Sequence, residues 1–94
     1  MFAIGWHDNG SVRLEGRLDA ASAPQAREFL AEVQGICRLD FTRLDYIASA
    51  GLGILVAVQR RLRDGGGGLV LAGLSPHLRE VLGLAGFEGI FEFE

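Results

Sequence analysis

A single hydroxyl group lies in the stretch Tyr46–Gly53, which reads YIASAGLG. Ser49 stands there between Ala48 and Ala50, after residues typical of a strand and before residues typical of a helix. A serine at this position can act as a helix N-cap, because its oxygen accepts a hydrogen bond from an unpaired backbone N–H of the first turn. It can also be the group on which the function depends. The residues alone favour the cap and leave the second interpretation open.

The residues on either side of this hydroxyl are small. They are Ala48, Ala50, Gly51 and Gly53. Exposed N–H groups at a helix N-terminus attract negative charge, and a surface without bulky side chains lets another protein approach closely. The run Gly51–Gly53 also resembles part of a dinucleotide fingerprint, but it lacks the third glycine and stands inside the expected helix. The pattern therefore favours a protein contact over a nucleotide site.

Three aspartates, Asp19, Asp40 and Asp45, lie near the ends of expected elements. Turn and cap chemistry accounts for each of them taken singly. Asp19 precedes the first expected helix and Asp45 precedes the serine stretch, so both could lie at the edge where parallel strands end, the usual docking edge of open sheets. The candidate partner-binding residues are therefore Asp19, Asp45, Ala48, Ser49, Ala50, Gly51, Leu52 and Gly53.

Other residue patterns predict neither a metal site nor an enzyme active site. His7 and His77 are far apart in the sequence, and the spacing of His77 and Glu80 is more typical of a solvated helix face than of a metal site. The glycines Gly65–Gly68 leave a helix and enter a strand without a lysine, so they predict a turn and not a phosphate loop. Ser49 has no base near it in the sequence, so no nucleophilic triad can be assembled. We expect no cofactor and no catalysis.

The composition predicts one ordinary globular domain spanning residues 1–94. The net charge is −3, all nine basic residues are arginine, and they form no cluster, which argues against a nucleic-acid surface. The single cysteine, Cys37, excludes an internal disulfide and lies in an apolar run where a buried thiol is expected. Neither a signal peptide nor a membrane-spanning stretch is expected, so the sequence predicts a cytoplasmic protein without membrane insertion.

Periodicity and turn signals predict the elements that must position Ser49. Strands are expected at 2–6, 11–18, 36–41, 69–71 and 90–93, and helices at 23–33, 50–63 and 76–84. Asn9 and Gly10 favour a hairpin turn between the first two strands. Ser22 and Gln25 fit a capping box for the first helix. Thr42–Asp45 reads as a turn before the serine stretch.

The order β-β-α-β-α-β-α-β predicts an α/β fold. Helices that join successive strands imply right-handed crossovers and hence parallel strand pairs, while the N-terminal hairpin adds an antiparallel pair. The expected architecture is a small mixed sheet with three main helices packed on it. In the helix at 50–63 the leucines and valines are expected to face inward, with Gln59 and the arginines towards water.

The run Leu39–Leu55 resembles the signature of STAS domains in the anti-sigma factor antagonist family. That signature is a strand ending in Asp, a short turn, and Asp-Ser-Ser-Gly-Leu or a close variant opening a helix. Gly16–Asp19 fits the family pattern before the first helix, and Leu69–Pro76 fits the pattern leading to Gly86 and Phe87. The resemblance covers essentially the whole chain and implies the mixed α/β fold predicted above.

The resemblance also implies a function and a partner. Antagonists of this family bind an anti-sigma factor that is also a serine kinase, and thereby release the sigma factor. Phosphorylation of a serine at the head of the second long helix breaks the complex, and a phosphatase restores it. By resemblance, Ser49 is the phosphoacceptor of such a switch, and the protein is a binding module and not an enzyme.

Two positions depart from the family pattern and define the alternative. Ala48 stands where the pattern has an acid, and Ala50 stands where it has a second hydroxyl. A single hydroxyl followed by Ala-Gly-Leu also resembles the small STAS subunits that brace the ATPase of ABC-type lipid transporters. The alternative function is therefore a scaffold subunit that is not phosphorylated. A small-molecule or nucleotide binder that uses the N–H groups of Ala50–Gly53 is a third and weaker interpretation.

Overall fold

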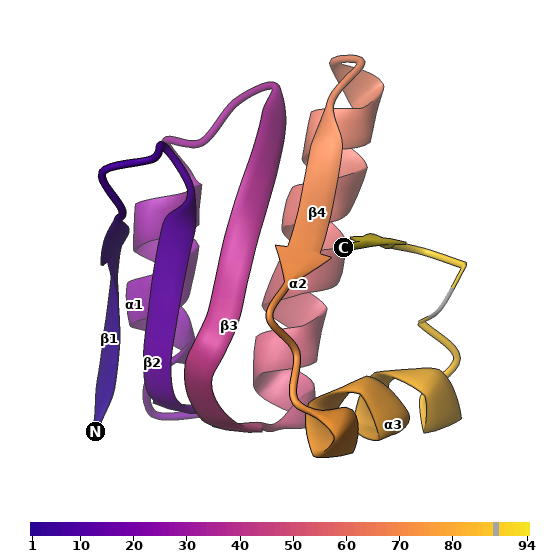
Figure 1. The fold of residues 1–94 in the computed structure, drawn as a ribbon. Coiled ribbons are helices and arrows are strands. Elements are labelled where there is room, and N and C mark those ends of the chain that lie inside the picture. The colour runs from indigo at the N-terminus through magenta and orange to yellow at the C-terminus, as the bar shows by residue number, and fades with distance from the viewer. Residues whose placement is uncertain (88) are drawn as a thin grey trace.

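The computed structural model describes residues 1–87 and 89–94. Its elements, in chain order, are β1 (Phe2–Trp6), β2 (Val12–Leu18), α1 (Ala23–Leu30), β3 (Ile36–Ile47), α2 (Ser49–Asp64), β4 (Gly68–Ala72), α3 (Pro76–Leu84) and β5 (Glu92–Phe93) (Figure 1). The strands form one sheet in the order β1-β2-β3-β4-β5, in which β1 is antiparallel to β2 and the other neighbouring pairs are parallel. The predicted α/β class, with its N-terminal hairpin and parallel β-α-β units, is confirmed.

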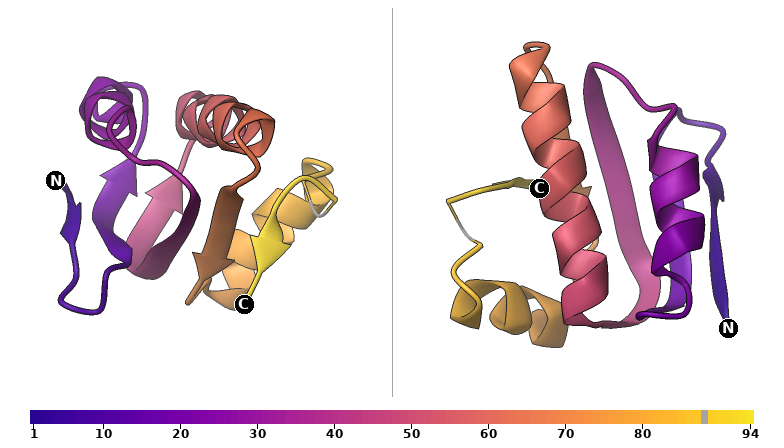
Figure 2. Two further views of the ribbon diagram at one scale, coloured as in Figure 1. Left: turned by 90° about the horizontal axis from the view of Figure 1, so that it is seen from above. Right: turned by 180° about the vertical axis from the view of Figure 1, so that it is seen from behind.

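Helices α1 and α2 cover one face of the sheet, and α3 lies at the end where β4 finishes (Figures 1 and 2). The alternation of β2 explains why one face is apolar, because Val12, Leu14 and Leu18 are fully buried while charged residues lie between them. Leu30 of α1 and Leu55 of α2 are also fully buried in the same core cluster. Burial of these apolar side chains holds the two helices on the sheet.

Helix α1 is shorter than predicted and ends at Leu30 instead of Val33. Beyond Leu30 the chain tightens, with three-residue hydrogen bonds from Glu32 N–H to Phe29 and from Val33 N–H to Leu30. Gly35 then adopts a φ of 72° and turns the chain towards β3. Val33 stays buried, as expected for a residue of the apolar stripe, although it lies beyond the end of the helix.

The predicted capping box at the start of α1 is wrong. The Ser22 hydroxyl donates to the Arg17 carbonyl (2.8 Å) and accepts from the Asp19 N–H (2.9 Å), so it points back to β2. The Asp19 carboxylate holds the turn before the helix, since its Oδ1 accepts from the N–H groups of Ala21 and Ser22 at 3.1 Å each. Asp19 therefore has a structural role at the head of α1.

Strand β3 is longer than predicted and includes Thr42–Asp45, which the sequence indicated as a turn. Pairing with β2 keeps these residues extended: Glu15 lies opposite Arg43, and Gly16 lies opposite Leu44. The register between β2 and β3 shifts on either side of these pairs, as at a β-bulge. This extension carries β3 to the edge of the sheet where α2 begins.

Two side chains in the core test further predictions. Gln59 was expected to face water, but it is only 4% exposed. Its amide donates to the Ile90 carbonyl (2.7 Å) and accepts from the Leu69 N–H (2.6 Å), so it joins α2 to β4 and to the C-terminal segment. The buried Cys37 was predicted correctly, and burial raises the pKa of its thiol.

Candidate functional site

The candidate site lies where β2 and β3 end and α1 and α2 begin. Leu18 pairs with Ile47 at the last position of both strands, so Asp19 and Ser49 follow at the same end of the sheet. Asp45 is an exposed residue of β3 near this end. The structure thus brings Asp19, Asp45 and Ser49 to one edge of the sheet, as the sequence predicted.

Ser49 is the first residue of α2 and not its N-cap, which corrects the prediction. The N-cap is Ala48, which remains extended (φ −100°, ψ 170°) because its N–H donates to the Leu18 carbonyl at 2.9 Å and continues the pairing of β2 with β3. The Ala48 carbonyl then accepts the first helical bond, from the Leu52 N–H at 3.0 Å. Ser49 is exposed, and within the described part of the chain its hydroxyl makes no hydrogen bond. The Ser49 hydroxyl is therefore accessible to a partner and does not cap α2.

The small residues around Ser49 divide between two roles. Gly51 and Leu52 are buried against the sheet, so they seat the helix and do not form the contact surface that the sequence predicted. A Cβ on Gly51 would lie 2.6 Å from Leu18 Cγ and 3.2 Å from Ile47 Cγ1. The surface around the hydroxyl consists instead of the exposed residues Ala50, Gly53 and Ala57, with Ala48 half-buried. Ala57 was missed, although helical spacing of four residues from Gly53 could have indicated it.

The two glycines of α2 should respond to alanine in opposite directions. Gly51→Ala gains about 0.5–1 kcal/mol of helix propensity but forces a methyl group into Leu18, which costs about 1–3 kcal/mol. A Cβ on Gly53 meets nothing within 4 Å, so Gly53→Ala keeps the propensity gain alone. Urea unfolding should show Gly51→Ala destabilised and Gly53→Ala stabilised by about 0.5–1 kcal/mol. Equal and stabilising effects of both substitutions would contradict the close packing of α2 on β2.

Arg17 and Tyr46 add a feature to this edge that the sequence analysis missed. They are paired between β2 and β3, and the Arg17 guanidinium lies 4.2 Å from the centre of the Tyr46 ring. Arg17 Nε is also 3.9 Å from the Asp19 carboxylate. The N–H of Ser22 is the main cause that lowers the pKa of Asp19, with a smaller contribution from Arg17. Because Thr42–Asp45 was predicted as a turn, the pairing of Arg17 with Tyr46 could not be anticipated.

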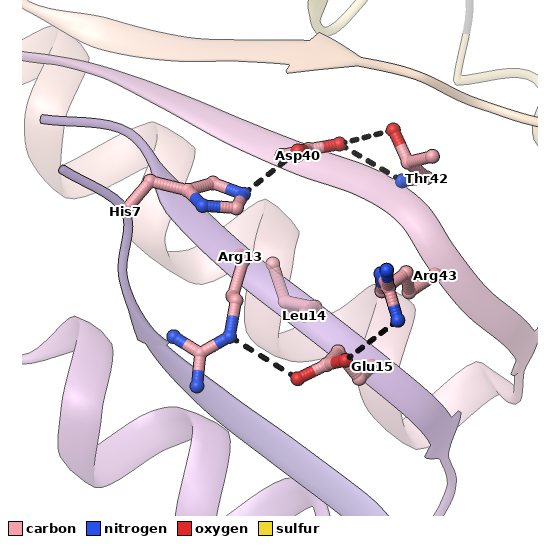
Figure 3. Close-up of a pocket in the computed structure, with 7 residues that line it drawn as sticks. All are labelled: His7, Arg13, Leu14, Glu15, Asp40, Thr42 and Arg43. Atoms are coloured by element: carbon pink, nitrogen blue, oxygen red, sulfur yellow. Dashed lines mark hydrogen bonds and ion pairs between the residues drawn. The ribbon is translucent and has the colours of Figure 1, made fainter. Parts of the chain in front are cut away.

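A second polar cluster lies on β2, β3 and the β1–β2 turn, as a close-up shows (Figure 3). His7 Nε2 lies 2.9 Å from Asp40 Oδ2, and Asp40 Oδ1 accepts from both the N–H and the hydroxyl of Thr42. Partial burial raises the pKa of Asp40, but the hydrogen bonds from Thr42 and His7 outweigh it and leave the pKa below its usual value. Beside this cluster, Glu15 lies between Arg13 (3.1 Å) and Arg43 (3.9 Å). These contacts join the β1–β2 turn, β2 and β3 to one another.

Among the described residues, no group of three or more His, Cys, Asp or Glu side chains is placed to hold a metal ion. His77 and Glu80 are exposed on α3. No helix in the described part of the chain is both long and apolar enough to cross a membrane.

Comparison with known proteins identifies the class. A family profile described as "Mlab, STAS domain" matches residues 2–92. BtrV of Bordetella bronchiseptica, named as a candidate anti-sigma factor antagonist, is 46% identical over 82 residues, which cover 83% of this chain and 71% of BtrV. The anti-sigma-B factor antagonist of Listeria monocytogenes is 33% identical over 91 residues, which cover 93% of this chain and 80% of that protein.

Solved structures share the fold. The anti-sigma factor antagonist SpoIIAA in its unphosphorylated form has a TM-score of 0.70 and 22% identity, and covers all of this chain and 87% of SpoIIAA. The phosphorylated form of SpoIIAA from Bacillus has a TM-score of 0.68 and 21% identity, with 100% of this chain and 91% of that chain covered. The fold and the sequence matches define a STAS domain. Within that class, the chain belongs to the anti-sigma factor antagonist family.

Proposed function

We propose that this protein is an anti-sigma factor antagonist that works by partner switching, with Ser49 as its phosphoacceptor. Two of its relatives are named for antagonism of anti-sigma factors, and SpoIIAA, which shares the fold, exists in phosphorylated and unphosphorylated forms. The observation that carries the assignment of Ser49 is its exposed hydroxyl at the head of α2, which takes no part in capping the helix.

The proposed switch is electrostatic and local. A phosphate on Ser49 adds about −1.5 to −2 charges, and the N-terminus of α2 tolerates them because its N–H groups carry partial positive charge. The domain can therefore keep its fold when it is modified. A partner that lies closely on Ala50 and Gly53 must instead bury the new charge against a surface fitted to a neutral hydroxyl, and the complex dissociates.

The proposed partner is an anti-sigma factor with serine kinase activity, and a phosphatase would return the protein to its binding form. We place this cycle in the cytoplasm, where sigma factors act. Asp19, Asp45 and the exposed residues Ala48, Ala50 and Gly53 form the proposed contact surface around Ser49. Arg17 and Tyr46 extend this surface along the same edge.

Incubation with the cognate anti-sigma factor kinase and ATP should add one phosphate, which intact-mass spectrometry detects. Ser49→Ala should abolish the addition. Ser75→Ala is the matched control, because Ser75 is also exposed at the head of a helix but serves as the N-cap of α3, accepting from the Leu78 N–H at 3.1 Å. Phosphate on the Ser49→Ala protein would move the acceptor to another residue.

The alternative function is a STAS scaffold subunit that binds the ATPase of an ABC-type lipid transporter. The observation that favours it is the absence of a second hydroxyl and of an acid beside Ser49, since Ala50 and Ala48 occupy those positions. In that function the Ser49 hydroxyl stays unmodified. Mass spectrometry of the protein purified from its native host distinguishes the two, because only the switch predicts a phosphorylated fraction.

A further inference from the structure

The outer edge of β1 and the neighbouring side of α1 form a groove with a volume of about 440 Å³. Its lining residues are Ile4, Gln25, Glu28, Phe29 and Glu32. We call it the β1 groove. Strand β1 is the first strand of the sheet order, and the ribbon views show it as the outermost strand on that side (Figures 1 and 2).

The backbone of β1 presents hydrogen-bonding groups to this groove. The Arg17 N–H donates to Met1 O (2.9 Å) and the His7 N–H donates to Ser11 O (2.7 Å). In the regular antiparallel register, the backbone N–H and C=O groups of residues 1, 3, 5 and 7 therefore point to β2. The intervening residues Phe2, Ile4 and Trp6 therefore direct their N–H and C=O groups outward. Arg13 makes one long contact, at 3.4 Å, with the Trp6 carbonyl.

Apart from the Arg13 guanidinium at the Trp6 carbonyl, the residues of β1 supply none of the features that usually prevent strand pairing at a sheet edge. Such edges are commonly protected by charged residues, proline or a bulge. The strand reads FAIGW, and its pairing with β2 has no register shift. An unprotected edge with outward backbone groups is suited to the addition of a further strand.

The side chains of the β1 groove specify what kind of strand fits. Ile4 and Phe29 form an apolar floor, extended by Trp6, whose ring lies 5.7 Å from that of Phe29 and which is 56% exposed. Glu28 and Glu32 are exposed on the α1 side and line the same groove. Glu28 lies on α1 and Glu32 lies in the tighter turn that follows Leu30. Four residues of such backbone span about 6–8 Å, and two residues along a strand span nearly 7 Å, so basic side chains at alternate strand positions match the two carboxylates.

We propose that the β1 groove binds an extended basic segment of a partner protein, which adds as a strand to β1. Its apolar side chains cover Ile4 and Phe29, and its lysine or arginine side chains pair with Glu28 and Glu32. A second copy of the chain is disfavoured as occupant, because twofold pairing of two β1 edges would bring the same glutamates of both copies together. The site is separate from Ser49 and does not depend on its phosphorylation.

A peptide titration tests the proposal on the full chain. The probe is the capped peptide Val-Thr-Lys-Thr-Lys-Thr-Val, whose valines and lysines share one face of a strand. Trp6 is the single tryptophan, so its fluorescence reports binding directly. We expect saturable fluorescence change and NMR shifts of the Phe2, Ile4 and Trp6 amides. The peptide with glutamate in place of lysine should bind at least tenfold more weakly, as should a peptide N-methylated at the amides that face β1.

A charge swap supplies the matched variants. Glu28→Lys with Glu32→Lys should weaken binding of the lysine peptide at least tenfold and allow the glutamate peptide to bind. Asp64→Lys with Glu80→Lys makes the same change in net charge at exposed positions outside the groove and should leave binding unchanged. Circular dichroism confirms that each variant is folded.

Three results of the peptide experiments would overturn the proposal. They are no binding of the lysine peptide, equal binding of both peptides, and equal loss of binding in the two charge-swap variants. A dimer of the free protein that pairs through the Phe2, Ile4 and Trp6 amides would assign the groove to a second copy, and the proposal would fall with it.

Discussion

Ser49→Asp is expected to weaken the complex with the anti-sigma factor by about 1–3 kcal/mol, which is roughly fivefold to 150-fold in Kd. The carboxylate places a permanent charge where the switch places a phosphate. Ala50 and Gly53 offer no bulk that would hold a partner away from it, so the charge must be desolvated when the complex forms. Isothermal titration calorimetry with the purified partner measures the change.

Ser49→Asn is the control for this substitution, because asparagine has nearly the shape of aspartate without its charge. It should retain most of the affinity. Equal losses of affinity for Ser49→Asn and Ser49→Asp would mean that the size of the side chain, and not its charge, weakens the complex. An Asp variant that binds like the unmodified protein would favour the scaffold alternative, in which nothing at position 49 is switched.

Much of the fold could be predicted because local sequence and tertiary structure agree. Asn9 and Gly10 mark the hairpin, where Gly10 has a φ of 87° and the Asn9 side chain accepts from the Ser11 N–H. Helix α3 spans Pro76–Leu84 as predicted, and the Ser75 hydroxyl caps its start. In both places a few neighbouring residues determine the geometry, so the sequence signal suffices.

The errors arose where distant contacts determine the local structure. Thr42–Asp45 looks like a turn by composition, yet pairing with β2 keeps it extended. Ser22 is a typical helix cap by residue type, but its hydroxyl donates instead to the Arg17 carbonyl near the end of β2. Such competition between a local motif and a strand partner cannot be read from periodicity.

The candidate site was predicted in position but not in detail. The shared edge of Asp19, Asp45 and Ser49 follows from parallel strand order, which the element pattern indicated. Which small residues face outward depends on how α2 is rotated on the sheet. The observed rotation places Gly51 where an added Cβ would lie 2.6 Å from Leu18 Cγ, so it needs a glycine at that position. The rotation that buries Gly51 is also the one that leaves the Ser49 hydroxyl exposed.

The same rotation buries Gln59 two turns further along α2, and this residue should be the most sensitive polar position of the core. Gln59→Leu removes the acceptor of the buried Leu69 N–H and the donor to the Ile90 carbonyl. An unpaired buried group costs about 1–3 kcal/mol, and leucine burial offsets part of the cost. We expect a net loss of about 1–3 kcal/mol in urea unfolding, or roughly 5–20 °C in Tm.

Two further variants separate the hydrogen bonds from helix propensity. Arg60→Leu also introduces a leucine into α2, at the neighbouring and exposed position. Its free energy of unfolding should stay within about 0.5 kcal/mol of that of the unmodified protein. Gln59→Glu keeps an acceptor for the Leu69 N–H but faces the Ile90 carbonyl with a buried carboxylate, so its pKa rises on folding. Its penalty should therefore be smallest at low pH and grow as the pH rises through the folded pKa. A penalty for Gln59→Glu, relative to the unmodified protein, that is the same at all pH values would mean that this side chain reaches water, and that α2 is rotated differently on the sheet.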